Sequence, residues 1–235
     1  MASKASSPVP TACPICLGTS LTLGPNGRLS PNGTMPRCAG CGALERHRAF
    51  RTVFDAIVPV LAGSRVLQFS PDTCAPREPF AHFEISEFNG PNHLDMADIA
   101  RPAASYDLVI ANHVLEHVED DMAALGELGR ITADEGVVFL SVPDLLRVAR
   151  TKEYGYARED KYGHWRLYGP DIVERWRRAV PDWLGLGVVA RDPITDEPDR
   201  ATLLSRSPER IAALAGALTD AGLEPFDAFA PARVH

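Results

Sequence analysis

The feature that most constrains this chain is an alternation of short apolar runs with stretches of helical pattern, from about residue 64 to residue 142. The runs are too short to be helices and read as buried strands. Between the last two of them, apolar residues recur at helical spacing over Leu115–Ile131. Strands that alternate with helices predict a parallel sheet with helices on its faces. The predicted strands are Arg65–Phe69, Ala81–Ile85, Tyr106–Ala111 and Val137–Val142.

The C-terminal part contains a hairpin-like pair of strands, Leu184–Arg191 and Ala201–Ser205, joined by an acidic turn that contains proline. Helical patterns cover Asp171–Val180 and Pro208–Ala221. We expect Gly222 to end the second of these helices.

Four of the five cysteines form two CxxC pairs near the N-terminus. Each pair can wrap two thiolates around one side of an ion, and two pairs complete a tetrahedral site of four sulfurs. In a reducing compartment this spacing indicates zinc rather than disulfides, with a redox pair as the alternative. The predicted metal ligands are Cys13, Cys16, Cys38 and Cys41.

The segment between the two pairs is rich in Gly, Pro and Asn, which predicts a turn-rich ribbon. We expect positive φ at Gly40 and Gly42, which flank the last cysteine. A segment this short cannot build its own core, so the ion would supply the free energy of folding. With four thiolates and no open position, the ion would be structural. The ribbon itself would clamp substrate, bind a partner or cap the next domain.

The composition is that of a globular protein, with 45% hydrophobic and 23% charged residues among 235. The net charge is −7, whereas proteins that bind nucleic acid by neutralising phosphates usually carry the opposite sign. Nucleic acid is therefore not the favoured partner. No apolar run approaches the ~20 residues of a membrane span. The first residues lack the apolar core of a secretory signal, so we expect a cytoplasmic protein.

A basic cluster, Arg46, Arg48 and Arg51, stands at the start of a predicted helix just after the second cysteine pair. It could bind an anionic group, or it could pair with acidic residues of the main domain. We favour the pairing, because arginines beside carboxylates are often structural.

Two motifs carry a resemblance to a known superfamily. The segment Tyr106–His117 reads as a strand followed by the turn VLEH, and Gly136–Pro143 reads as a strand that ends in VP. This arrangement resembles the class I S-adenosylmethionine-dependent methyltransferases. The paired CxxC motifs that run into LERHR (Leu44–Arg48) are similar to one subset of that superfamily. The resemblance covers about residues 11 to 180.

The resemblance implies an α/β fold, namely the Rossmann-like class I methyltransferase sheet of seven strands with the last pair antiparallel, and a small N-terminal zinc ribbon. It implies S-adenosyl-L-methionine and a structural Zn²⁺ as cofactors. We expect a disordered lead at 1–10, the zinc ribbon at 11–45 and the methyltransferase domain at 46–235. A lid-like insertion is expected within that domain, at about 145–170.

The first cofactor loop departs from the superfamily pattern. A typical loop is glycine-rich so that the backbone can approach the ligand, whereas Gln68–Cys74 contains no glycine. Two explanations compete: Ser70 and Asp72 bind the cofactor with their side chains, or the domain has lost cofactor binding. We favour binding, because the subset that the chain resembles typically reads FAPE at this loop.

The resemblance assigns the other cofactor contacts by position. Glu87, after the second strand, would accept the ribose hydroxyls, and Asp98 would accept the adenine amino group. Asn112, after the central strand, would meet the methionine end. The alternative is that Glu87 and Asp98 are ordinary solvated loop residues. The complete set of cofactor candidates is Phe69, Ser70, Asp72, Glu87, Met96, Ala97, Asp98, Asn112 and His113.

The polar, aromatic-rich insertion is the predicted substrate lid. Its His-x-Arg-x-Tyr-Gly pattern resembles the same subset and would place three side chains on a loop that faces the cofactor. Histidine suits a base near neutral pKa, and arginine could hold a carboxylate or phosphate in a bidentate contact. The alternative is a helix-capping loop, and the resemblance implies a mainly structural role for the LEH residues that end at His117. Candidate catalytic residues are His164, His113 and Tyr168, and candidate substrate-binding residues are Arg166 and Tyr168.

Three functions fit these observations. The favoured one is a methyltransferase that acts on an O, N or C nucleophile of a small-molecule metabolite or biosynthetic intermediate. The second is an RNA or protein methyltransferase that uses the zinc ribbon for recognition. The third is a zinc-binding scaffold without catalysis. Neither the acceptor molecule nor an oligomeric state is specified by these patterns.

Overall fold

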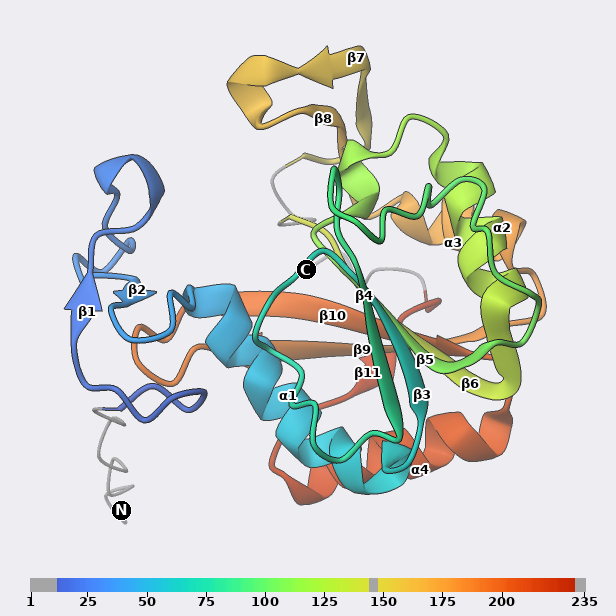
Figure 1. Cartoon of the computed structure of the whole chain (residues 1–235), viewed down its shortest axis with the longest axis horizontal. Coiled ribbons are helices and arrows are strands. Elements are labelled where there is room, and N and C mark those ends of the chain that lie inside the picture. The colour runs from blue at the N-terminus through green and yellow to red at the C-terminus, as the bar shows by residue number, and fades with distance from the viewer. Residues whose placement is uncertain (1–11, 144–147, 231–235) are drawn as a thin grey trace. The chain divides into compact units, whose positions relative to one another are not determined.

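The computed structural model describes residues 12–143 and 148–230, so the lead expected at 1–10 and residues 144–147, where the insertion begins, lie outside the described residues. The main sheet has seven strands in the order β11-β9-β10-β6-β5-β3-β4 (Figure 1). Strands β4, β3, β5 and β6 are parallel, β10 is antiparallel to β6, and β11 is antiparallel to β9. This confirms the expected Rossmann-like sheet. Its strands are β3 (Arg65–Phe69), β4 (His82–Ser86), β5 (Tyr106–Asn112), β6 (Thr132–Ser141), β9 (Leu184–Arg191), β10 (Pro198–Ser205) and β11 (Phe226–Asp227).

The chain divides into two compact units. The first extends to Asp55 and also contains residues 72–76 and 190–199; the second contains residues 56–71, 77–189 and 200–235. We expected the N-terminal part to end at residue 45. The unit around the cysteines instead includes most of helix α1 (Glu45–Leu61) and the tip of the β9–β10 hairpin.

The first unit is rich in turns, as its Gly, Pro and Asn content predicts. Besides its part of α1, it contains a two-stranded antiparallel sheet of β1 (Leu21–Thr22) and β2 (Arg37–Cys38), with a 3₁₀ turn η1 (Pro25–Gly27) between them. A small cluster of buried side chains includes Cys13, Cys38 and Ala43.

The second unit has an apolar core on one face of the sheet. There, helices α2 (Asp121–Ile131) and α3 (Ile172–Ala179) pack against alternate strand residues such as Leu67, Val109 and Val138. The packing is close enough to require glycine in α2, because a Cβ at Gly129 would lie 2.8 Å from a methyl group of Val180. Helix α4 (Pro208–Asp220) lies on the other side of the sheet (Figure 1).

The helix predicted over Leu115–Ile131 is divided in two. A 3₁₀ turn, η2 (Leu115–His117), is followed by α2, which begins only at Asp121. Asp120 caps α2, since its side chain accepts a hydrogen bond from the Ala123 N–H at 2.9 Å. The prediction was wrong at this point because the apolar spacing continues across the break.

The insertion contains regular secondary structure that we did not predict from the sequence. It is an antiparallel hairpin of β7 (Lys152–Arg158) and β8 (His164–Leu167), with the 3₁₀ turn η3 (Glu159–Lys161) between them. We expected a loop here, so this part of the chain is more ordered than its composition suggests.

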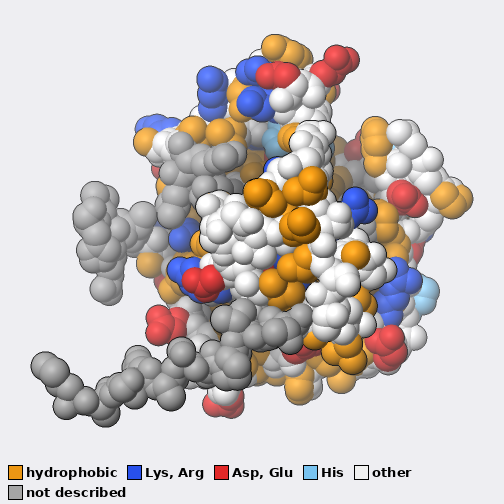
Figure 2. All heavy atoms as spheres, turned by 90° about the vertical axis from the view of Figure 1, so that its left-hand side faces the viewer, with side chains coloured by type: hydrophobic (Ala, Val, Ile, Leu, Met, Phe, Trp, Pro, Cys, Tyr) orange, Lys and Arg blue, Asp and Glu red, His pale blue; other side chains and the backbone are white. Residues whose placement is uncertain are grey.

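On the face drawn in Figure 2, basic and acidic side chains are interspersed with hydrophobic ones. In the described part of the chain, no helix combines the length and the apolar character that crossing a membrane would require.

Candidate functional site

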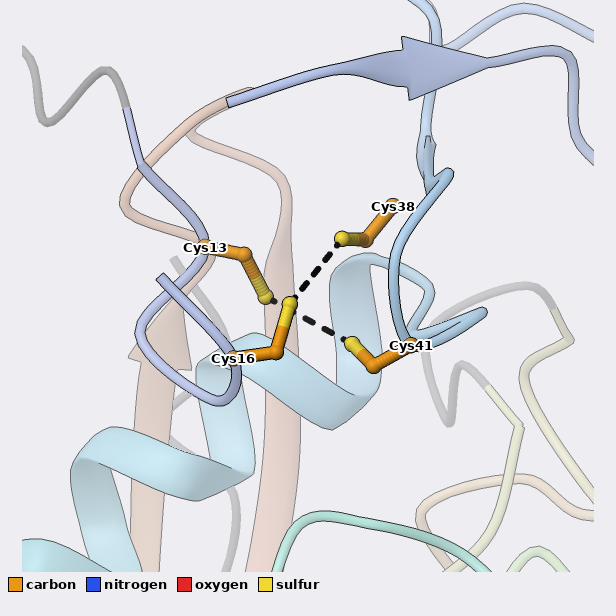
Figure 3. Close-up of side chains that lie close together, drawn as sticks. All are labelled: Cys13, Cys16, Cys38 and Cys41. Atoms are coloured by element: carbon orange, nitrogen blue, oxygen red, sulfur yellow. Dashed lines mark hydrogen bonds between the residues drawn. The ribbon is translucent and has the colours of Figure 1, made fainter. Parts of the chain in front are cut away.

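Four cysteine sulfurs converge in the first unit. The Sγ atoms of Cys13 and Cys41 are 3.8 Å apart, and those of Cys16 and Cys38 are 3.5 Å apart. All four lie within 4.8 Å of one another (Figure 3). Four Zn–S bonds of about 2.3 Å in a tetrahedron place the sulfurs about 3.8 Å apart. The donor set and its spacing therefore fit one structural zinc ion.

Both cysteine pairs use the same turn. The Leu17 N–H donates to the Cys13 carbonyl at 2.8 Å, and the Gly42 N–H donates to the Cys38 carbonyl at 2.9 Å. Leu17 and Gly42 both have positive φ, 62° and 76°. Gly40, where we also expected positive φ, has an ordinary one. Space is tight there, because a Cβ would lie 3.3 Å from the Sγ of Cys16, and glycine fits without displacing that sulfur.

The thiols differ in how readily they ionise. Burial raises the pKa of Cys41 to about 12. Burial also opposes ionisation of Cys38, but hydrogen bonds from the Cys41 backbone and the Cys16 side chain outweigh it and lower the pKa to about 7. An ion in the site would hold all four sulfurs as thiolates, so metal affinity should fall as the pH falls.

Several arginine–carboxylate pairs lie in this unit, and two of them are bidentate. Arg48 makes a bidentate contact of 2.8 and 2.6 Å with Asp192, and both side chains are fully buried. Arg28 makes a second bidentate contact, of 2.8 and 2.7 Å, with Glu45. Arg51 pairs with Asp55 on α1 at 2.7 Å. Arg48 and Arg51 of the basic cluster therefore have the structural role that we favoured.

In the second unit, the carboxyl ends of the parallel strands meet at one edge of the sheet. Phe69 at the end of β3 is in register with Ser86 on β4 and with Ala111 on β5. The next residue, Ser70, has a left-handed backbone with φ of 65°, and its N–H donates to the Ser86 carbonyl at 2.8 Å. Ser70 thus adopts, without glycine, a conformation that glycine usually supplies.

The end of β5 is held in a similar way. Asn112 is buried and accepts a hydrogen bond from the Ser141 hydroxyl at 3.3 Å. His113, which follows it, has φ of 51°, and its N–H donates to the Ser141 carbonyl at 3.0 Å. The backbone therefore turns sharply after two neighbouring strands, β3 and β5, and the side chains of Ser70 and His113 lie at those turns.

The loop after β4 carries the acidic candidates. Glu87 and Asp98 are exposed, Ala97 is half-buried and Met96 is buried. The loop is fixed to α2, because Glu127 accepts the Ile99 N–H at 2.8 Å. This arrangement leaves both carboxylates accessible to a ligand.

A charged network that the sequence analysis missed also holds this loop. Glu84 on β4 accepts hydrogen bonds from Arg101, Tyr106 and Asn92. Burial opposes ionisation of Glu84, but these contacts outweigh it and lower its pKa, while burial and Glu84 raise the pKa of Tyr106 to about 12. The sequence signal was a charged residue, Glu84, inside a predicted strand.

Asp72 belongs to the first unit. Its carboxylate accepts hydrogen bonds from the N–H of Cys74 at 2.9 Å and from the thiol of the same residue at 2.8 Å. Burial and this carboxylate raise the pKa of Cys74. The structure thus gives the Asp72 side chain a role in shaping its own turn.

Histidines gather beside the end of β5. His113 Nδ1 lies 3.8 Å from a carboxylate oxygen of Glu116, whose side chain is 1% exposed. The rings of His117 and His164 meet edge to face, with centroids 4.7 Å apart. Burial, with the nearby His117, His113 and Lys161, lowers the pKa of His164 to about 4. At neutral pH this imidazole is therefore uncharged and offers a lone pair.

We expected Arg166, in β8, and Tyr168, the first residue after β8, to face a substrate, and the structure buries both side chains. Tyr168 is fully buried and its hydroxyl donates to Asp121 at 2.7 Å. Arg166 is 4% exposed, and its guanidinium contacts Glu153 and the carbonyls of Val118 and Glu119. The expectation is corrected: these two side chains hold the hairpin to the body of the unit.

Residues 48–180 match the model of a protein family that is described as a methyltransferase domain. This is more than half of the chain. The chain belongs to the methyltransferase-domain family. A comparison with curated proteins finds no match.

Solved structures of several methyltransferases are similar to this domain at low identity. One is an S-adenosylmethionine-dependent methyltransferase from Thermotoga maritima (13% identity, 67% of this chain and 89% of that chain, TM-score 0.41). Another is the 1,6-didemethyltoxoflavin-N1-methyltransferase of Burkholderia thailandensis (12% identity, 66% of this chain and 77% of that chain, TM-score 0.46). A third is an S-adenosylmethionine-dependent methyltransferase from Mesorhizobium loti (13% identity, 64% of this chain and 94% of that chain, TM-score 0.40).

In the methyltransferase domain, the strand register brings Phe69, Ser70, Asn112 and His113 to one edge, with Glu87 directly after the adjacent strand. Open α/β sheets bind ligands at this edge. Met96, Ala97 and Asp98 lie on the loop that follows β4.

Proposed function

We propose that this domain is an S-adenosylmethionine-dependent methyltransferase that transfers a methyl group to an O, N or C nucleophile of a small-molecule metabolite or biosynthetic intermediate. The observation that carries the proposal is the register of the parallel strands, which brings the ends of β4, β3 and β5 together. The match to methyltransferase domains over the same strands supports it.

We propose that the candidate residues contact different parts of the cofactor. Glu87 would accept the ribose hydroxyls, and Asp98 the adenine amino group, with Met96 and Ala97 beside the ring. The exposure of Glu87 and Asp98 is compatible with this role. Phe69, Ser70 and Asn112 would meet the methionine end.

When bound, S-adenosylmethionine would supply an activated methyl group for in-line displacement. Such a transfer needs an acceptor lone pair aimed at the methyl carbon. His113 lies at the end of β5, and His164 lies in the hairpin beside η2. We propose that these two imidazoles line the acceptor site, and that Arg166 and Tyr168 position the hairpin that carries His164.

We also propose that Cys13, Cys16, Cys38 and Cys41 hold a structural zinc ion. The four sulfurs leave no position open for a substrate, so the ion would stabilise the first unit rather than take part in methyl transfer.

The small-molecule acceptor is favoured over RNA or protein because several arginines near the cysteines are already paired. Arg28, Arg48 and Arg51 contact Glu45, Asp192 and Asp55 respectively. The net charge of −7 and the mixed charges in Figure 2 also favour a small acceptor.

A substitution at His164 tests the proposal once a screen of metabolites, read by the mass gain of one methyl transfer, has found an acceptor. His164→Ala should lower turnover by roughly 100-fold or more. Its affinity for S-adenosylmethionine, measured by calorimetry, should stay within about twofold of wild type. His82→Ala, an exposed histidine at the start of β4, serves as the control and should keep full turnover. Unchanged turnover in His164→Ala would refute its role in the reaction, and equal loss of cofactor binding would make it structural.

A further inference from the structure

Three potential metal ligands from two separate segments converge beside β5, away from the cysteines in sequence. Glu116 and His117 come from η2, and His164 comes from the first position of β8. One ligand atom from each lies within 4.8 Å of the other two. We propose that Glu116, His117 and His164 form a second metal site, which binds a divalent transition-metal ion and leaves a position open for an oxygen ligand.

The donor set defines the class of ion. Two imidazoles and one carboxylate suit zinc, iron, nickel or a similar ion better than Mg²⁺ or Ca²⁺, which prefer oxygen ligands alone. Three protein ligands do not fill a tetrahedral shell, so water or a substrate oxygen would complete it. The four-sulfur site has no such open position. His117 is exposed, which gives solvent and small ligands a route to this second site.

The two ligand-bearing segments are fastened to each other. Arg166, two residues after His164, donates to the carbonyls of Val118 and Glu119, which directly follow His117. Arg166 is nine-tenths or more buried and also contacts Glu153. The relative position of the ligands is therefore set before an ion arrives, which lowers the entropic cost of binding one.

Two of the three ligand side chains have further contacts. The His117 ring has a hydrogen bond with the backbone of Gly163, the residue before His164. A backbone partner of this kind orients metal-binding histidines through the ring nitrogen that does not bind the ion. Glu116 is 1% exposed and has His113 Nδ1 at 3.8 Å. The site therefore has outer contacts as well as ligands.

The position of the site suggests what it does, and this step rests on the proposed function. His113 connects the end of β5 to the site, and the methionine end of the cofactor would lie at that strand end. An acceptor hydroxyl bound to the ion would have a lowered pKa and would lose its proton to solvent. The oxygen would then form a bond to the methyl carbon while the carbon–sulfur bond breaks, its electron pair remaining on sulfur. The acceptor class that follows is a metabolite with a hydroxyl or phenol group.

Metal content measured on the full chain tests the site. After equilibration with Zn²⁺ and removal of free ion, wild type should hold about two ions per chain. His117→Ala and His164→Ala should each lose the second ion and keep the first. Cys16→Ser should keep the second and lose the first. His82→Ala is the matched histidine control and should hold as many ions as wild type.

Two results would overturn the proposal: a single ion in wild type, or the wild-type content in both histidine variants. Circular dichroism spectra and melting temperatures of the variants exclude loss of folding as the cause of a lower content. Glu116→Gln, which keeps the shape of the side chain, should weaken Zn²⁺ binding by at least about tenfold, and an unchanged affinity would remove Glu116 from the ligand set. Calorimetry with S-adenosylmethionine separates the two proposals, because cofactor binding without a second ion refutes only the metal site. A second ion without cofactor binding refutes only the methyltransferase.

Discussion

At the scale of single residues, buried charges decide how the cysteine-containing unit is assembled. Arg48 lies only seven residues beyond Cys41 in sequence, but its partner Asp192 comes from the tip of the β9–β10 hairpin. The same guanidinium donates to the carbonyls of Pro36 and Ala43, so it links three segments. Removing either partner of such a buried pair destabilises the fold strongly, because the remaining charge is then buried without a counter-charge.

Replacing Arg48 with Met should therefore lower the free energy of unfolding by about 3–5 kcal/mol. Both side chains are fully buried, so Asp192 would be left without its cation. Denaturant titration at neutral pH measures the loss. Arg51→Ala on the same helix is the control; its partner Asp55 is largely exposed, and the expected change is at most about 1 kcal/mol. Similar losses in the two variants would contradict this account of Arg48.

The glycine-free loop after β3 is also explained at this scale. The sequence indicated a departure from the family pattern but not its consequence. Ser70 takes the left-handed conformation itself, and its hydrogen bond to the Ser86 carbonyl holds it there. For a residue other than glycine this conformation costs about 1–3 kcal/mol, which the surrounding contacts must offset, and no composition rule identifies which residue will adopt it.

At the scale of elements, the buried strands were predictable and the exposed hairpin was not. The runs at Arg65–Phe69 and Tyr106–Ala111 match β3 and β5 to within a residue, because both faces of a central parallel strand are apolar. In β7 most residues are exposed, so the strand carries no alternating pattern to read. Arg166 and Tyr168 were placed at a substrate because the His-x-Arg-x-Tyr-Gly pattern resembles a methyltransferase subset, and that resemblance did not indicate that both side chains are buried.

The break between η2 and α2 gives a prediction for one element. Asp120→Ala removes the side chain that caps the first turn of α2 and should cost about 1 kcal/mol of stability. The effect should appear as a lower midpoint of chemical denaturation. Glu119→Ala, at the neighbouring exposed position, should leave the midpoint within error of wild type. If the two variants are equally stable, the cap does not determine where α2 begins.

At the scale of the whole molecule, the sheet and the family were predictable, whereas the contacts between distant segments were not. The order of apolar runs was enough to predict the parallel strands, and the VLEH segment indicated the methyltransferase family. The cysteine-containing unit includes residues 72–76 and 190–199, and no local sequence pattern connects these segments to the cysteines. The convergence of His164 on Glu116 and His117 has the same origin, since the hairpin fold brings it there.

Binding of S-adenosylmethionine, measured by titration calorimetry on the full chain, tests the central claim most directly. Wild type should bind the cofactor, and Glu87→Ala should bind it at least about tenfold more weakly, because a hydrogen bond to a charged group is worth about 1.5–3 kcal/mol. Glu135→Ala, at an exposed position near the start of β6, is the matched control and should bind as wild type does. No heat from wild type at millimolar cofactor would leave a zinc-binding scaffold in place of an enzyme. Equal affinity in wild type and Glu87→Ala would contradict the assignment of this strand end to the ribose.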